Sequence, residues 1–569
     1  MAPRAGIFAP LALAADIASA ATAISGIDGR LLENVRLFLD EPDCEANPAA
    51  VSRYVRDLPA DVLPALEAFG YYEPRITARR TADTADCWSV ELAIEPRDPV
   101  VVRAISAELA GAAGDDEAMR AYVADFPLAP GSTLDHGRLR AFKSRLEALA
   151  RERGYIDARF AEERVDVYLD ERAADVTLTF DSGPRYAFGD VTFDTTALRP
   201  DVLAQFVPFE PGEPYDASAI ADLQRTLTAS EYFTRARVVP RFDAAGGGTI
   251  PVRVDAVPAA PTSSAIGVGF STDDGPRFSY ERENVRRNRA GHRYDLDVLL
   301  AQVRQSATLD YRIPIGNPQR DWWSLRVGGE REDIDAGVGS VLRFGPHRVL
   351  ITGERTTTRF VDLLVERDEI AGGTLDTKLV LPGIKWARSS RDDLVRPRQG
   401  FRLSYGVSVG VGDIRLVQAD FRGKWLTATG WDARVIVRGR AGVTVQDREF
   451  HRVPLSLRFF SGGDNSVRGY DYESLGPRNA AGELVGGNRV LETSVEYEHP
   501  VTESWSVAAF VDTGNAFLRS NLDLRTGAGI GARWFTPIGP VRVDVAWPVS
   551  TAPGEDRGPR LHLGLGPDL

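Results

Sequence analysis

One arginine in this chain of 569 residues stands in a setting that suits a specific charge contact. Arg468 lies two residues before an aromatic residue in a segment rich in turn formers, Phe459-Phe460-Ser461-Gly462-Gly463-Asp464-Asn465-Ser466-Val467-Arg468-Gly469-Tyr470. A guanidinium offers a planar fork of donors to a carboxylate, and in a space of reduced dielectric such a pair can fix a flexible loop. An isolated loop arginine is usually solvated. Arg468 is not isolated, because two further motif-like segments lie downstream of it, Phe510–Gly514 and Gly531–Asp544.

The two cysteines, Cys44 and Cys87, both lie in the first folding unit. In an exported protein such a pair is a disulfide candidate, and in a cytosolic protein it is more often two separate thiols. Residues 1–23 resemble a secretory signal peptide, with an early arginine, a short apolar stretch and two small-residue sites, although Asp16 interrupts the apolar stretch. We therefore expect export and a disulfide between Cys44 and Cys87.

Signals of catalysis are missing from the sequence. It contains no H-E-x-x-H motif and only six histidines. Acidic and basic residues scattered along the inner faces of strands are better explained as the lining of a lumen than as acid–base pairs. We predict no enzyme, no cofactor and no metal.

Charge divides the chain into two halves. Residues 1–261 have a net charge of −15 and residues 262–569 a net charge of +2. An acidic front half repels phosphate backbones, so we exclude nucleic acid as a partner. No run approaches the roughly 20 apolar residues that a membrane-spanning helix needs.

The front half contains a repeated unit of roughly 80 residues. Pro130–Asp135 recurs as Pro211–Asp216, and a segment of helical period follows each Asp, a plausible N-cap. Each predicted helix ends at a similar aromatic tripeptide, and segments of period-two alternation follow it. The tripeptides are Gly70-Tyr71-Tyr72, Gly154-Tyr155-Ile156 and Glu231-Tyr232-Phe233. Three α+β modules are therefore predicted. Such modules either space two other parts or offer edge strands to an extended client segment.

From Thr262 the pattern changes to long period-two alternation. In the segment 401–411, apolar residues alternate with small or charged ones, and 541–547 repeats the pattern. Strands of this length with charged residues on the second face favour a transmembrane barrel around a polar lumen. At about 19 residues per strand and connection, 308 residues give roughly 16 antiparallel strands.

Together these features resemble the bacterial outer-membrane barrel-assembly superfamily, whose members carry periplasmic POTRA repeats before a 16-stranded barrel. Val467-Arg468-Gly469-Tyr470 is similar to the family's lumen-loop motif, and Asp512 matches the acidic partner on an inner strand. The three repeats and the amino-acid sequence around the motif resemble those of the TamA branch. Its members act with TamB, a large periplasmic protein anchored in the inner membrane.

The resemblance implies a domain order and a function. The expected segments are a signal peptide (1–23), three POTRA-like repeats in the periplasm (24–97, 98–183 and 184–261) and an outer-membrane barrel (262–569). The implied function is the insertion or secretion of β-rich clients such as autotransporters, in contact with outer-membrane lipid and a TamB-like partner. The alternatives are a passive channel or receptor tethered by its repeats, and a two-partner-secretion type of transporter.

The first and last predicted barrel strands, 266–270 and 561–566, are rich in glycine. Glycine weakens a strand and leaves few side chains to pack, so a lateral opening is predicted where these strands meet. The alternative is that the glycines only accommodate curvature or bulky lumen contents. The seam residues are Gly267, Gly269, Gly564 and Gly566.

Overall fold

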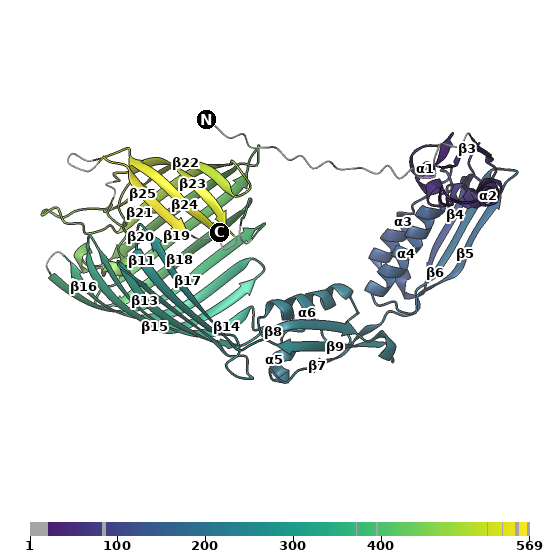
Figure 1. The fold of residues 1–569 in the computed structure, drawn as a ribbon. Helices are drawn as coiled ribbons and strands as arrows, with labels where there is room; N and C mark the ends of the chain where they lie inside the picture. The colour runs from purple at the N-terminus through teal and green to yellow at the C-terminus, as the bar shows by residue number, and fades with distance from the viewer. Residues whose placement is uncertain are drawn as a thin grey trace, which may run out of the picture. The chain divides into compact units, whose positions relative to one another are not determined.

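The computed structural model describes residues 21–81, 87–370, 373–393, 396–519, 522–536, 539–551 and 557–565 (Figure 1). The chain forms two compact units. One holds the described residues up to Thr192 with Phe209–Ala221 and Val239–Arg253, and the other holds the remainder. Three small sheets precede one sheet of 16 strands, which confirms the predicted fold class.

The first repeat packs two helices on a sheet of order β1-β3-β2. Helix α2 buries Leu58, Val62 and Leu66 against the central strand β3, and Cys44 is joined to Cys87 by a disulfide. The elements are β1 (Ala21–Ser25), α1 (Gly29–Arg36), α2 (Pro48–Glu67), β2 (Arg75–Arg80) and β3 (Ser89–Glu95). Most of the predicted signal peptide lies outside the described residues, but its last three residues begin β1 and pair with β3.

The second repeat has the same topology, with sheet order β4-β6-β5. Asp135 caps helix α4, because its carboxylate accepts a hydrogen bond from the N–H of Arg138 at 2.9 Å. Gly154 ends this helix with φ +87, where a Cβ would lie 2.9 Å from the carbonyl oxygen of Tyr186. The elements are β4 (Val101–Ala110), η1 (Gly111–Asp115), α3 (Glu117–Ala124), α4 (His136–Glu152), β5 (Arg159–Tyr168) and β6 (Ala173–Asp181).

The third repeat also has one central strand, in the order β7-β9-β8. Asp216 again starts the long helix, accepting a hydrogen bond from the N–H of Ser218 at 2.8 Å. The elements are β7 (Ala187–Asp194), α5 (Pro200–Ala204), α6 (Ala217–Ala229), β8 (Phe233–Pro240), η2 (Phe242–Ala244) and β9 (Thr249–Pro258). Within the described chain, every helix falls short of the length and apolarity needed to cross a bilayer.

The remaining strands form one antiparallel sheet in sequence order, from β10 to β25. Outward side chains of β18, from Tyr405 to Val411, are apolar and 40–50% exposed, as lipid contact requires. The strands are β10 (Thr262–Ser271), β11 (Gly275–Asn284), β12 (Arg293–Ala301), β13 (Arg304–Pro314), β14 (Asp321–Ile334), β15 (Gly337–Thr352), β16 (Arg355–Ile370), β17 (Gly373–Arg391), β18 (Gly400–Gly412), β19 (Leu416–Ala428), β20 (Arg434–Gln446), β21 (Arg489–Pro500), β22 (Trp505–Phe517), β23 (Arg525–Thr536), β24 (Gly539–Pro548) and β25 (Arg560–Leu565).

The connection between β20 and β21, residues 447–488, enters the barrel; we call it the lumen loop. It contains two short helical turns, η3 (Phe450–Arg452) and η4 (Leu455–Leu457). Near its start, the N–H of Ser456 donates to Glu366 at 2.7 Å and the N–H of Leu455 donates to Asp368 at 2.9 Å. Both carboxylates belong to the inner face of β16, so the loop is fixed first to that wall.

Candidate functional site: the lumen loop and the seam

The guanidinium of Arg468 lies against Asp512, on the wall formed by the last strands. Its Nε donates to Oδ2 at 2.7 Å and its Nη2 donates to Oδ1 at 3.0 Å, so the pair is bidentate. The backbone N–H of Arg468 donates to the same carboxylate at 3.1 Å. Both side chains are buried, and the ring of Phe510 lies 3.3 Å from the guanidinium carbon. The resemblance predicted this pair by residue.

The Arg468–Asp512 pair is part of a larger charge network. Nη1 of Arg468 also donates to Glu496 at 2.8 Å and to Asp544 at 2.9 Å, on β21 and β24. Arg533 of β23 binds the same two carboxylates, and Arg438 of β20 lies 3.7 Å from Asp512. Three guanidiniums therefore face three carboxylates. This balance matters because an unpaired charge at this depth is strongly destabilising.

The residues on either side of Arg468 explain the rest of the motif. Val467 is fully buried in a cluster with Tyr470 and Leu475. Gly469 has φ +97, and a Cβ there would lie 3.0 Å from the carbonyl carbon of Trp547. The hydroxyl of Tyr470 donates to the backbone carbonyls of Thr526 on β23 and of Ser550, which lies just after β24. The motif thus seats the loop tightly on the inner wall.

The first and last strands are not hydrogen-bonded to each other over the described residues. β10 has a ladder only with β11, and β25 only with β24. Outward side chains of β10 are correspondingly more open than those of β18, with Ile266 at 71% and Val268 at 83% exposure. The described part of the barrel therefore has a seam between two unpaired edges, which we call the seam.

The predicted seam glycines make room for neighbouring side chains. A Cβ on Gly267 would lie 2.4 Å from the hydroxyl oxygen of Ser279, and one on Gly269 would lie 3.1 Å from Nε of Arg277. A Cβ on Gly564 would lie 3.4 Å from Nε of Arg542, an ordinary van der Waals contact. The contacts at Gly267 and Gly269, but not the one at Gly564, support accommodation of lumen side chains, the alternative role of the glycines. Gly566 lies outside the described residues.

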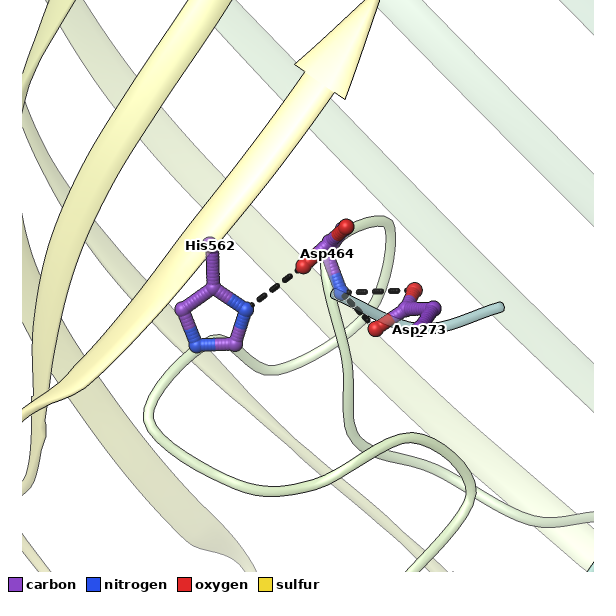
Figure 2. A group of neighbouring side chains, drawn as sticks. All are labelled: Asp273, Asp464 and His562. Carbon is purple, nitrogen blue, oxygen red and sulfur yellow. Dashed lines mark hydrogen bonds and ion pairs between the residues drawn. The ribbon is translucent and has the colours of Figure 1, made fainter. Parts of the chain in front are cut away.

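Side chains of the lumen loop bridge the seam. Asp464 accepts hydrogen bonds from the hydroxyl of Thr272, in the turn after β10, and from Nδ1 of His562 on β25, both at 2.7 Å. Its own N–H donates to Asp273 at 3.0 Å (Figure 2). The N–H of Leu563 donates to the hydroxyl oxygen of Thr272 at 3.1 Å. We call these contacts the seam latch.

The tautomer of His562 follows from its two partners. The N–H of Gly469 donates to Nε2 at 2.9 Å, so Nε2 is unprotonated and the ring proton sits on Nδ1. Ligand atoms of Asp273, Asp464 and His562 lie within 4.8 Å of one another, close enough for a cation. In this tautomer, however, Nδ1 has no lone pair to offer a metal. The cluster in Figure 2 suits a hydrogen-bonded contact between loop and strand better than a metal site.

Comparison with known proteins identifies the family. The model of the Omp85 superfamily domain matches residues 287–568. The model of TamA POTRA domain 1 matches residues 22–96, and a POTRA model described as a surface antigen variable number repeat matches residues 101–183. The chain belongs to the Omp85 superfamily.

Relatives of this Omp85 chain include two curated outer membrane protein assembly factors named BamA. The protein of Neisseria meningitidis serogroup B is 22% identical over 261 residues, 39% of this chain and 33% of the relative. That of Nitratidesulfovibrio vulgaris is 28% identical over 138 residues, 23% of this chain and 17% of the relative. The aligned parts span a third or less of these relatives.

A solved structure shows the same fold. The crystal structure of BamA from Haemophilus ducreyi lacking POTRA domains 1–3 superposes with a TM-score of 0.66 at 13% identity. The superposition covers 81% of this chain and 99% of that one.

Sequence reasoning about this Omp85 chain missed several residues of the site. Arg533 and Asp544 stand in a string that the sequence had already singled out, and Glu496 lies on an alternating strand. His562 carried a weaker signal, because one histidine within a glycine-rich final strand has no characteristic spacing. Asp464 lies inside the loop motif, so its position was known but not its partners.

Proposed function

We propose that this Omp85 protein inserts or translocates β-rich client proteins, such as autotransporters, at the bacterial outer membrane, with its repeats in the periplasm. It does so without catalysis or a cofactor. The seam carries the proposal, because its two edges have no shared ladder over the described residues and are bridged by side chains instead. An unpaired edge is a template on which an extended client segment can form a strand.

The lumen loop gives the opening a physical control. Few side-chain hydrogen bonds hold the seam latch, and each contributes about 0.5–1.5 kcal/mol, so the seam opens at a lower cost than any paired strand interface. Meanwhile the buried Arg468 network keeps the loop on the strand wall. The loop can thus release β10 without leaving the lumen.

A TamB-like periplasmic protein is the proposed partner. Support comes from the TamA-type first repeat and from small sheets whose outer strands, such as β1 and β2, leave edges free for β-augmentation. The net charge of −15 over residues 1–261 favours partner segments that are neutral or basic. Co-purification of the intact protein from membranes, with identification of the bound proteins, tests this partner.

A crosslink across the seam tests the function. Thr272→Cys with Leu563→Cys introduces thiols on two residues that are in contact across the seam, since the backbone N–H of Leu563 donates to the hydroxyl oxygen of Thr272 at 3.1 Å. Locking them with a short bifunctional reagent is expected to stop assembly of a β-barrel client in liposomes, and a cleavable reagent restores assembly. The matched control is Ser279→Cys with Leu299→Cys, opposite each other on β11 and β12, which already share a ladder. Full assembly by the locked, folded barrel contradicts the proposal.

A passive channel is the second candidate, and the lumen cavity of about 830 Å³ favours it. Deletion of residues 24–261 separates the two functions. A passive channel keeps both its conductance and its cellular role after this deletion, whereas an assembly factor keeps only the conductance.

A further inference from the structure

The inner wall formed by β18, β19 and β20 carries a cluster of positive charges. Arg402 lies opposite Lys424, which lies opposite Arg438, and in the next row Arg422 lies opposite Arg440. Neighbouring strands are about 4.8 Å apart, so these five side chains form a compact group, which we call the cation wall. All five line the lumen cavity of about 830 Å³.

The protein neutralises this wall only in part. Arg438 and Arg440 have carboxylates nearby, Asp512 at 3.7 Å and Glu492 at 3.5 Å. For Arg402 and Arg422, by contrast, no carboxylate of the described residues lies within ion-pair distance, and both side chains are exposed to the lumen. Like charges directly opposite on neighbouring strands destabilise a sheet. A bound anion removes that penalty.

Most acidic residues of the same cavity lie on other elements. Glu330 and Glu332 are on β14, Asp362 is on β16, Asp273 and Asp274 are in the turn after β10, and Glu473 is in the lumen loop. Two carboxylates lie beside the wall itself, Glu492 opposite Arg440 and Asp420 two residues before Arg422. The five cations outnumber these two and Asp512, so the field at the cation wall is positive. An anion that enters the lumen is therefore drawn to β18–β20.

We propose that the cation wall binds a multiply charged phosphate group, supplied either by a free phosphate or by the head group of a phosphomonoester lipid. Guanidinium forks match phosphate oxygens in pairs, and two exposed forks beside a lysine can contact several oxygens at once. The site is independent of the assembly function, because it needs only the lumen and not the seam.

Titration calorimetry of the intact, detergent-solubilised protein with sodium pyrophosphate at low salt tests the site. We expect binding by the wild type, and affinity at least about tenfold weaker in the double variant Arg402→Gln/Arg422→Gln, through loss of two charge-assisted contacts. The matched control is Arg359→Gln/Arg367→Gln, which removes the same charge from exposed positions on the outer face of β16. Heat-modifiable migration on gels checks that each barrel is folded.

Either of two calorimetric results overturns the proposal: no pyrophosphate binding by the wild type, or an equal loss of affinity in both double variants. Protein reconstituted in phosphatidylcholine with and without phosphatidic acid then distinguishes the source. If the lipid head group is the ligand, phosphatidic acid weakens pyrophosphate binding to the wild type. If a free phosphate is the ligand, the two membranes give the same affinity.

Discussion

The backbone N–H of Gly469 donates a hydrogen bond to Nε2 of His562 across 2.9 Å. The preceding residue, Arg468, is fixed on Asp512 by a bidentate pair. One turn of the lumen loop therefore connects a buried charge network with the last barrel strand. The Arg468–Asp512 ion pair is buried and costs much free energy to break, whereas the neutral hydrogen bond between Gly469 and His562 costs little.

Replacement of His562 by Phe is expected to loosen the seam without unfolding the barrel. Phe keeps a flat ring at this position but loses the hydrogen bonds to Asp464 and Gly469. We expect more frequent openings in single-channel recordings. His451→Phe, an exposed change in the same loop region, is the control. An unchanged opening frequency in His562→Phe rules out a latch role.

Replacement of Arg468 by Ala is expected to destabilise the barrel by about 3–5 kcal/mol, because Asp512, Glu496 and Asp544 lose a shared cation. Urea titration followed by heat-modifiable migration measures the change. Arg468→Lys is also expected to be destabilised, since an ammonium cannot make the bidentate contact. Arg478→Ala removes an exposed arginine of the same loop and serves as the control. Equal midpoints for Arg468→Ala and Arg478→Ala contradict this account.

Period-two alternation predicted the barrel because lipid and lumen act on alternate residues of every strand, as from Phe401 to Val411. The network around Arg468 was only partly predictable. Whether Asp544 points inward depends on strand register, and a shift of one residue turns it outward. The contact of Ser456 with Glu366 joins positions 90 residues apart, which no local pattern encodes.

Loss of the disulfide is expected to weaken the first repeat selectively. Closing a loop of 43 residues contributes about 3–4 kcal/mol in the chain-entropy model. In Cys44→Ser/Cys87→Ser, hydrogen exchange of peptides from α2 is expected to speed up, while peptides from α4 in the second repeat stay unchanged. Thiol titration of the unreduced wild type is the independent check, and two free thiols there refute the disulfide.

The second repeat is expected to lose stability in acid through Asp116. Burial raises the pKa of this carboxyl, but hydrogen bonds from Arg153 at 2.6 Å and from the N–H of Met119 outweigh it and hold the pKa below its ordinary value. A carboxyl whose pKa is lowered on folding contributes its full stabilisation when the pH is above its unfolded-state pKa of about 3.9. This stabilisation is lost as the pH falls through its folded-state pKa. Hydrogen exchange of α3 peptides, corrected for the intrinsic rate, is expected to show falling protection from pH 5 toward pH 3. Asp116→Asn is expected to cost about 1–3 kcal/mol at neutral pH and to flatten this dependence, whereas Asp170→Asn, at an exposed turn, leaves it intact. An unchanged slope in Asp116→Asn assigns the acid sensitivity to other groups.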